Sequence, residues 1–275
     1  MKLIQQSFKI LEQTDFSLVG IKKFIERCGR VCYKSEDRIT DTSYEKFVNM
    51  LVKRDHARPL EFGTVHLQMY ISDFHKLRDT LCINNMWNDQ WIKYHYAGNI
   101  TYVTTNYRYY LAIIKVFPSA ENDFDPQDDE LYPKRYTVHF ITSRGIMDEF
   151  RTHVGLSHLA ESSRYCSYDK NRFGNELTFI IPNWVNTNCP NKEQEGPSVA
   201  SIEWSTVMLD AEASYMNLIK MGCTAQEARE VLPLSVKSEL ISCGFKDAWS
   251  NFFYRRCAKD AHPMAREIAI PLQEK

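Results

Sequence analysis

The sequence lacks the features that would place the protein in a membrane or a secretory pathway. No apolar run approaches the roughly 20 residues that a membrane-spanning helix needs, and the first residues, Met1 to Gln6, show no signal-peptide pattern. The formal net charge of −1 is too small for a chain that coats nucleic acid or an anionic membrane. We therefore expect a cytoplasmic protein that binds neither nucleic acid nor membranes.

Several chemical signatures are also missing. The eight cysteines include no Cys-x-x-Cys pair, so buried thiols explain them better than zinc ligands or a redox pair, and we expect no metal site. No cysteine has the local context of a nucleophile. A Gly-x-Gly-x-x-Gly fingerprint is absent, which argues against a dinucleotide held in Rossmann fashion. No internal repeat is evident.

The patterns that are present predict both helices and strands. Apolar residues at helical spacing predict helices over 17–32, 204–219 and 262–270. Thr42 with Glu45, and Thr224 with Glu227, form capping-box pairs that predict two further helix starts. Alternating or apolar runs predict strands over 64–71, 136–142 and 177–181, and we expect Gly145 to provide a tight exit from the second of these. Segments 117–133 and 182–198 read as surface loops within a single domain.

After a short helical pattern that begins at Ile146, the segment from 157 to 167 is polar, although strands are predicted on both sides of this unit. Guanidinium and imidazole groups in and beside it would donate to phosphate, with serine hydroxyls as neutral donors. The cations concerned are Arg144, Arg151, His153 and Arg164. The pattern is compatible with a phosphate-binding site and with a solvated loop stabilised by salt bridges.

Aromatic residues are dense between 73 and 110. Such rings can stack on bases, but they fill a protein core more often. The segment therefore leaves a core and an aromatic nucleic-acid-binding surface as alternatives.

The polar segment resembles the signature of the flavin-dependent thymidylate synthases, in which Arg-His-Arg is followed by seven residues, a serine and then Arg-Tyr. Here His153, the seven residues 155–161, Ser162 and Arg164 fall in register. Thr152 and Val154 occupy the positions of the two signature arginines, and Arg151 lies one residue before the first of them.

Other phrases are similar to the same family. They are Pro59-Leu60-Glu61, followed by Phe62 where the family has histidine; Thr104-Thr105-Asn106-Tyr107-Arg108; Ala228-Arg229 with Leu232-Pro233; and Asn251-Phe252 with Arg256. The resemblance implies an α+β fold with a mixed sheet and long helices. It also implies a homotetramer whose flavin and nucleotide sites are assembled from several chains.

The activity implied by the resemblance is methylation of dUMP to dTMP. The carbon comes from 5,10-methylenetetrahydrofolate, and the hydride comes from FAD that NADPH has reduced. The resemblance implies that Arg256 acts at the pyrimidine ring as the catalytic cation. The dUMP-binding residues implied are Glu149, Ser162, Ser163, Arg164, Arg229 and Arg256. The FAD-binding residues implied are Thr64, Arg151, Thr152, His153 and Asn251. The alternative is a family member that lacks synthase activity and only binds nucleotide or flavin.

Overall fold

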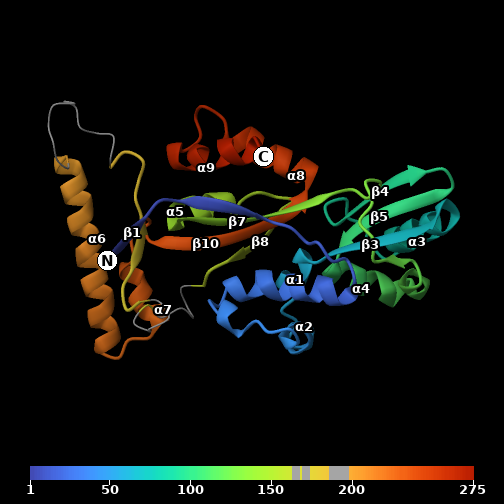
Figure 1. Cartoon of the computed structure of the whole chain (residues 1–275), viewed down its shortest axis with the longest axis horizontal. Helices are drawn as coiled ribbons and strands as arrows, with labels where there is room; N and C mark the ends of the chain where they lie inside the picture. The colour runs from blue at the N-terminus through green and yellow to red at the C-terminus, as the bar shows by residue number, and fades with distance from the viewer. Residues whose placement is uncertain (163–167, 169–173, 186–197) are drawn as a thin grey trace.

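Two four-stranded antiparallel sheets and their covering helices make up most of the computed structural model (Figure 1), which describes residues 1–162, 168, 174–185 and 198–275. The α+β fold class implied by the resemblance is confirmed. None of the helices in the described ranges combines the length and the apolar character needed to cross a bilayer.

The strands form three groups. One sheet has the order β2 (Ser7–Leu11), β7 (Arg135–Ser143), β10 (Lys237–Phe245), β8 (Ser157–Ala160). The other has the order β4 (Ile92–Ala97), β5 (Ile100–Asn106), β3 (Thr64–Tyr70), β6 (Phe124–Asp125). β1 (Lys2–Ile4) and β9 (Thr178–Ile180) form a parallel pair.

The described helices are α1 (Leu18–Val31), α2 (Ser43–Lys53), α3 (Ile71–Ile83), α4 (Tyr107–Val116), α5 (Arg144–Phe150), α6 (Val199–Lys220), α7 (Ala225–Ala228), α8 (Lys246–Arg256) and α9 (Pro263–Gln273). Short 3-10 turns are η1 (Glu36–Arg38), η2 (Arg58–Phe62), η3 (Pro118–Glu121) and η5 (Arg229–Val231).

Apolar side chains on both faces of the β2–β7–β10–β8 sheet are buried by helices. In Figure 1, α8 and α9 lie on one side of this sheet and α1 and α2 on the other. Phe140 and Leu240 pack against Trp249 and Phe252 of α8 on the first side. On the second side Ile241 belongs to a cluster with residues of α1. Because helices cover both faces, every residue of β10 after Lys237 is buried, including the polar Ser238, Glu239 and Ser242.

Most of the sequence-predicted elements are confirmed. The helix over 17–32 is α1, the predicted strands are β3, β7 and β9, and the last predicted helix is α9. At Thr224 the capping box forms: Glu227 N donates to the hydroxyl, and Thr224 N donates to the Glu227 carboxylate.

Two local predictions are wrong. Helix α2 does begin after Thr42, but the Thr42 side chain makes no capping hydrogen bond, since its backbone (φ −121°, ψ −5°) is not in the extended conformation of an N-cap. Strand β7 is not followed by a tight turn at Gly145. Helix α5 begins directly at Arg144, because the Ser143 hydroxyl accepts a hydrogen bond from Ile146 N and caps the helix.

Three strands and two helices of each four-stranded sheet repeat one topology. In the first unit β3 runs straight into α3, β4 and β5 follow, and β5 runs straight into α4. In the second unit β7 runs straight into α5, β8 and β10 follow, and β10 runs straight into α8, with β9, α6 and α7 inserted before β10. The strand orders β4–β5–β3 and β8–β10–β7 correspond.

The strand registers of the two units also correspond. The residue before the first helix pairs with the first residue of the returning strand: Tyr70 with Ile100, and Ser143 with Lys237. We expected no internal repeat, and the structure contradicts that expectation, because it contains this repeated topology. At this register Thr64-Val65-His66 corresponds to the identical run Thr137-Val138-His139, which is a short signal of the repeat in the sequence. Many other corresponding positions hold different residues. For example, the sixth residue of the first helix is Lys76 in one unit and Glu149 in the other.

Candidate active site

An arginine-lined cavity opens where β8 ends. Its volume is about 540 Å³, and its walls include four arginines from separate parts of the chain. Arg58 belongs to η2 and Arg229 to η5, while Arg144 and Arg151 stand at the two ends of α5. Ser162, just beyond β8, also lines it. Four guanidinium groups around one cavity favour a ligand with concentrated negative charge, such as a phosphate.

The carboxylates near these arginines hold them weakly. Arg144 and Arg151 both bond Asp148, at 3.2 and 3.3 Å, and Arg229 bonds Glu230 at 3.3 Å. All three ion pairs are partly exposed, and such pairs contribute only about 0–1 kcal/mol. An anionic ligand can therefore replace the carboxylates at little cost.

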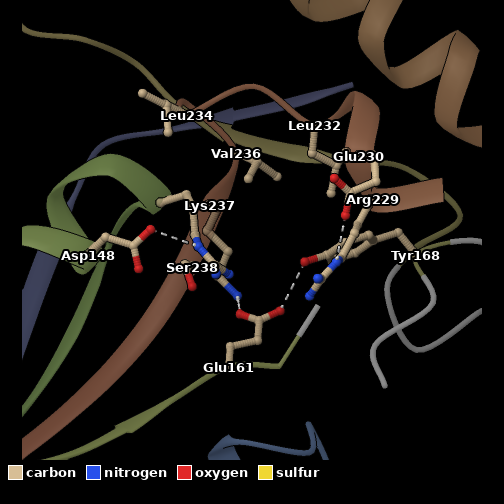
Figure 2. A pocket seen from close by; sticks show the side chains of 11 residues that line it. Asp148, Glu161, Tyr168, Arg229, Glu230, Leu232, Leu234, Val236, Lys237 and Ser238 are labelled. Carbon is tan, nitrogen blue, oxygen red and sulfur yellow. Dashed lines mark hydrogen bonds and ion pairs between the residues drawn. The ribbon is translucent and has the colours of Figure 1, made fainter. Parts of the chain in front are cut away.

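A smaller cavity of about 270 Å³ shares Arg144, Glu161 and Arg229 with the first. Figure 2 shows Glu161 between Lys237 and Tyr168 in this cavity. The Glu161 carboxylate accepts from Lys237 Nζ at 2.8 Å and from the Tyr168 hydroxyl at 3.4 Å. Because the two cavities are neighbours, a ligand larger than a phosphate has room to extend from one into the other.

A buried charge network supports the floor of both cavities. Lys237 bonds Glu161 and also Glu239, at 2.5 Å, and Glu239 in turn accepts from Lys34 and His139. Burial opposes the charged form of Lys237, but the two carboxylates outweigh it and raise its pKa. Burial likewise opposes the charge on Glu239, but its bonds to His139 and the lysines lower its pKa. Lys237 and Glu239 therefore both keep their charges at neutral pH.

Ser162 is placed by its backbone. Its N–H donates to the Cys32 carbonyl at the end of α1, at 3.1 Å, and the N–H of Glu161 donates to the Glu239 carbonyl at 2.8 Å. Lys237 also bonds the Glu161 side chain. The backbone that leads to Ser162, the serine of the family signature, therefore has a fixed orientation. The predicted dUMP contacts Ser163 and Arg164 lie outside the described residues.

His158 is a neutral group in the wall of the larger cavity. Its ring hydrogen-bonds to the Ser242 hydroxyl at 2.9 Å and to the His153 carbonyl at 3.2 Å. Burial lowers its pKa to about 4, with Arg151 and Arg58 acting in the same direction. The imidazole therefore adds no charge to the cavity at neutral pH.

Arg256 lies at the centre of a second group of predicted site residues. Its Nη1 donates to the Glu149 carboxylate at 2.6 Å and its Nε to His153 Nε2 at 2.7 Å. Its Nη2 donates to the Glu149 carbonyl at 2.7 Å and to the Thr152 hydroxyl at 3.3 Å. A guanidinium has five N–H groups, so these four bonds fix its orientation and leave one donor for a ligand.

The proton arrangement on His153 follows from this contact. Because Arg256 donates to Nε2, the ring must be neutral, and burial together with the charge of Arg256 lowers its pKa to about 4. The ring also packs against Phe252, with 4.9 Å between ring centroids. His153 is therefore a fixed, uncharged acceptor at neutral pH.

The structure brings together some of the residues predicted for flavin and not others. Thr152 and His153 both accept hydrogen bonds from Arg256. Asn251 is exposed on α8, the helix that carries Arg256. Thr64 belongs to the other four-stranded sheet, where its hydroxyl accepts from Arg135 at 3.2 Å. Among the described residues no interaction joins Thr64 to the Arg256 group.

The comparisons with known proteins agree with the motif. The family model described as thymidylate synthase complementing protein matches residues 134–275, just over half of the chain. The chain belongs to this family. It is the family of flavin-dependent thymidylate synthases that the signature resembled.

Similar solved structures include UMP/dUMP methylase PolB from Streptomyces cacaoi in two complexes. With 5-Br UMP the identity is 13% and the TM-score 0.46, covering 100% of this chain and 90% of that one. With 5-Br dUMP the identity is 14% and the TM-score 0.43, covering 100% and 91%. A search of curated proteins finds no match.

The matched range coincides with the second unit of the topological repeat. It begins one residue before β7 and includes α8 and α9, so the thymidylate synthase family model describes the unit that carries Arg256 and Arg229. The first unit lies outside it. The family-like phrases around Glu61 and Arg108 therefore belong to the unit that the model does not match.

The cavity residues that were not predicted from the sequence include Arg58, Lys237 and Cys32. Arg58 directly precedes the family-like phrase at Pro59, and this position was the one signal in the sequence that Arg58 belongs to the site. Lys237 and Cys32 sit at the start of a strand and the end of a helix, and nothing in their local sequence indicates that these ends meet at one cavity.

Proposed function

We propose that the protein is a flavin-dependent thymidylate synthase that methylates dUMP to dTMP, with 5,10-methylenetetrahydrofolate as the carbon donor and NADPH as the reductant. The arginine-lined cavity beside Ser162 carries this proposal, because membership of the family alone leaves open whether this chain can hold a nucleotide. A nucleoside monophosphate offers a dianionic group that suits such a cavity.

The phosphate of dUMP is assigned to the cavity between Arg58, Arg144, Arg151 and Arg229. The Ser162 hydroxyl supplies a neutral donor beside them. Electrostatic attraction of the substrate to these cations does not require a basic protein, since the field of a cleft is set by the charges that line it.

The pyrimidine ring is assigned to Arg256. Arg151 lines the cavity and Glu149 binds Arg256, so the last turn of α5 connects the phosphate cavity with the Arg256 group. A guanidinium fixed at the carbonyl edge of uracil stabilises the negative charge that develops when C5 becomes nucleophilic. This role replaces the thiolate addition that a cysteine would otherwise perform.

The surface beside His153 fits a flavin ring. Val154, which follows His153 in the chain, is 72% exposed, and Asn251 is exposed next to Phe252, whose ring packs against the buried, neutral His153. Arg151 and Arg255 supply cations near this surface, Arg255 through its bond to Asn251. When bound there, FAD supplies the hydride. The protein's part is to orient the ring with Thr152, His153 and Asn251.

Two assays test the proposal. Release of tritium from [5-³H]dUMP, in the presence of FAD, NADPH and the folate donor, measures the synthase reaction. Calorimetric titration with dUMP measures nucleotide binding by itself. Arg229→Ala should weaken dUMP binding, while Arg27→Ala, at an exposed position on α1 outside the cavity, serves as the matched control.

The alternative function is nucleotide or flavin binding without synthase activity. Thr152 and Val154 in the positions of two signature arginines favour it, since fewer cations face an FAD diphosphate. Tight dUMP binding without tritium release would establish this alternative. Absence of dUMP binding by the wild-type protein would refute the synthase proposal and the nucleotide-binding alternative, and FAD titration of the same protein would then test the flavin-binding alternative.

A further inference from the structure

The first unit of the repeat has a cavity at the place that corresponds to the contact between the loop after α5 and the start of α8 in the second unit. In the second unit the loop after α5 packs against the start of α8: a Cβ at Gly155 would lie 3.2 Å from Ala248 Cβ, and this loop carries His153. In the first unit the loop after α3 meets the start of α4. Between them lies a cavity of about 340 Å³.

Counting from the strand–helix junction identifies corresponding positions. Ala112 is the sixth residue of α4, and Asn251 is the sixth residue of α8. Ala112 lines the cavity. A small side chain therefore occupies, in the first unit, the position from which Asn251 projects in the second, and it leaves space there.

The walls of the cavity are aromatic and rigid. Trp87 and Trp91 line it, and the Tyr109 ring meets Trp91 edge-on with 5.6 Å between centroids. The Tyr109 hydroxyl donates to the Met86 carbonyl, which ties the loop after α3 to α4. The Arg108 guanidinium lies 5.3 Å from the centre of the Trp91 ring. Flat rings with fixed orientations are surfaces on which other flat rings stack.

The polar groups of the cavity specify the ligand further. The Arg108 charge is balanced by Glu61, whose carboxylate accepts from Nη1 at 2.5 Å, so the cavity does not require an anion. Asn85 and Asn88 place amide groups in the lining, and an amide both donates and accepts hydrogen bonds. Aromatic walls with amides at the rim suit a flat ring system that carries nitrogen and carbonyl groups at its edge.

We propose that this cavity binds a planar, fused-ring nitrogen heterocycle through stacking on Trp87 and Trp91. Its volume lies at the lower end of the range of ligand pockets, which is roughly 300–1,000 Å³, so it accommodates the ring system rather than a whole dinucleotide. The chemistry of the ligand is argued from the walls alone. Only the comparison with the second unit rests on the proposed function.

The test uses lumichrome, a flat tricyclic nitrogen heterocycle without sugar or phosphate, titrated into the full-length protein. Quenching of tryptophan and lumichrome fluorescence reports binding, and equilibrium dialysis gives the stoichiometry. Ala112→Trp fills the cavity and should raise the Kd of this site about tenfold or more. Ala112→Ser is the matched control and should bind as the wild type does.

Asn251→Trp, the change at the corresponding position of the second unit, should leave binding at the first unit in place. Trp87→Leu keeps the cavity open but removes one of the two rings on which the ligand stacks, so it should also weaken lumichrome binding. This variant replaces Ala112→Trp in the test if circular dichroism shows that Ala112→Trp does not fold. Unchanged lumichrome binding in folded Ala112→Trp or Trp87→Leu, or no binding to the wild type, would overturn the proposal. Neither readout depends on synthase activity, so failure here leaves the proposed function standing, and loss of synthase activity leaves this site standing.

Discussion

His158 makes the stability of the protein depend on pH in a predictable direction. Burial, with help from Arg151 and Arg58, lowers its pKa from 6.5 to about 4 in the folded chain. The unfolded chain therefore binds a proton at a higher pH than the folded chain does. Stability from this group is fully present above pH 6.5 and is lost as the pH falls through 6.5 toward 4.

The size of the effect follows from the two pKa values. Each pH unit of difference corresponds to 1.36 kcal/mol, so the interval from 6.5 to about 4 corresponds to about 3 kcal/mol. This is a large part of the roughly 5–15 kcal/mol that stabilises a typical domain. His153, whose pKa is also lowered to about 4, acts in the same direction.

Urea denaturation measured at a series of pH values between 4 and 7 checks the prediction. His158→Gln cannot be protonated but can donate to the His153 carbonyl, as the ring does. Its unfolding free energy should fall less than that of the wild type between pH 6.5 and 4, by about 3 kcal/mol. His56→Gln, at an exposed histidine, should keep the wild-type pH dependence. Identical slopes for His158→Gln and the wild type would show that His158 is not buried as a neutral group.

Four further predictions concern the cavity and Arg256. Arg256→Ala should lower kcat about 10²–10³-fold, as loss of one preorganised donor does, and near-normal turnover in a folded variant would exclude the role at the ring. Arg229→Ala should raise the KM for dUMP more than it lowers kcat, measured at two ionic strengths; an unchanged KM would place the phosphate elsewhere. Cys32→Ser should retain turnover although Cys32 lines the cavity, and loss of tritium release would instead indicate a thiolate mechanism. Lys237→Met should cost about 3–5 kcal/mol by leaving the buried Glu161 carboxylate without its cation, and adding Glu161→Gln should recover part of this in thermal unfolding; no recovery would mean that the two do not act as a pair.

The sequence indicated the local elements better than their arrangement. Helix α1 and strand β3 were predicted because apolar spacing reports which face of an element is buried. The cavity was foreseen only in part: Arg144 and Arg151 were candidate phosphate ligands, whereas Arg58 joins them through the packing of η2 beside β8, a contact between distant segments. Local patterns carry no information about such contacts.

The family signature predicted the group around Arg256 more fully. Glu149, Thr152 and His153 do contact Arg256, although they lie about a hundred positions away in the chain. Composition alone would have assigned Arg256 to an exposed helix end, since cations are favourable there. The motif was informative because it records residues that act together, and the physical basis of that grouping became visible only in the hydrogen bonds.

Because each chain contains two units of the same topology, the number of units in an assembly is twice the number of its chains. The homotetramer that the family resemblance implies would contain eight such units, because each of its four chains contributes a pair. Only the second unit of each chain carries Arg256 and Arg229, so that complex would have four sets of these residues and four positions where the first unit contributes packing surface instead. Light scattering on the purified protein tests the homotetramer, since four chains have about four times the 32.3 kDa mass of one.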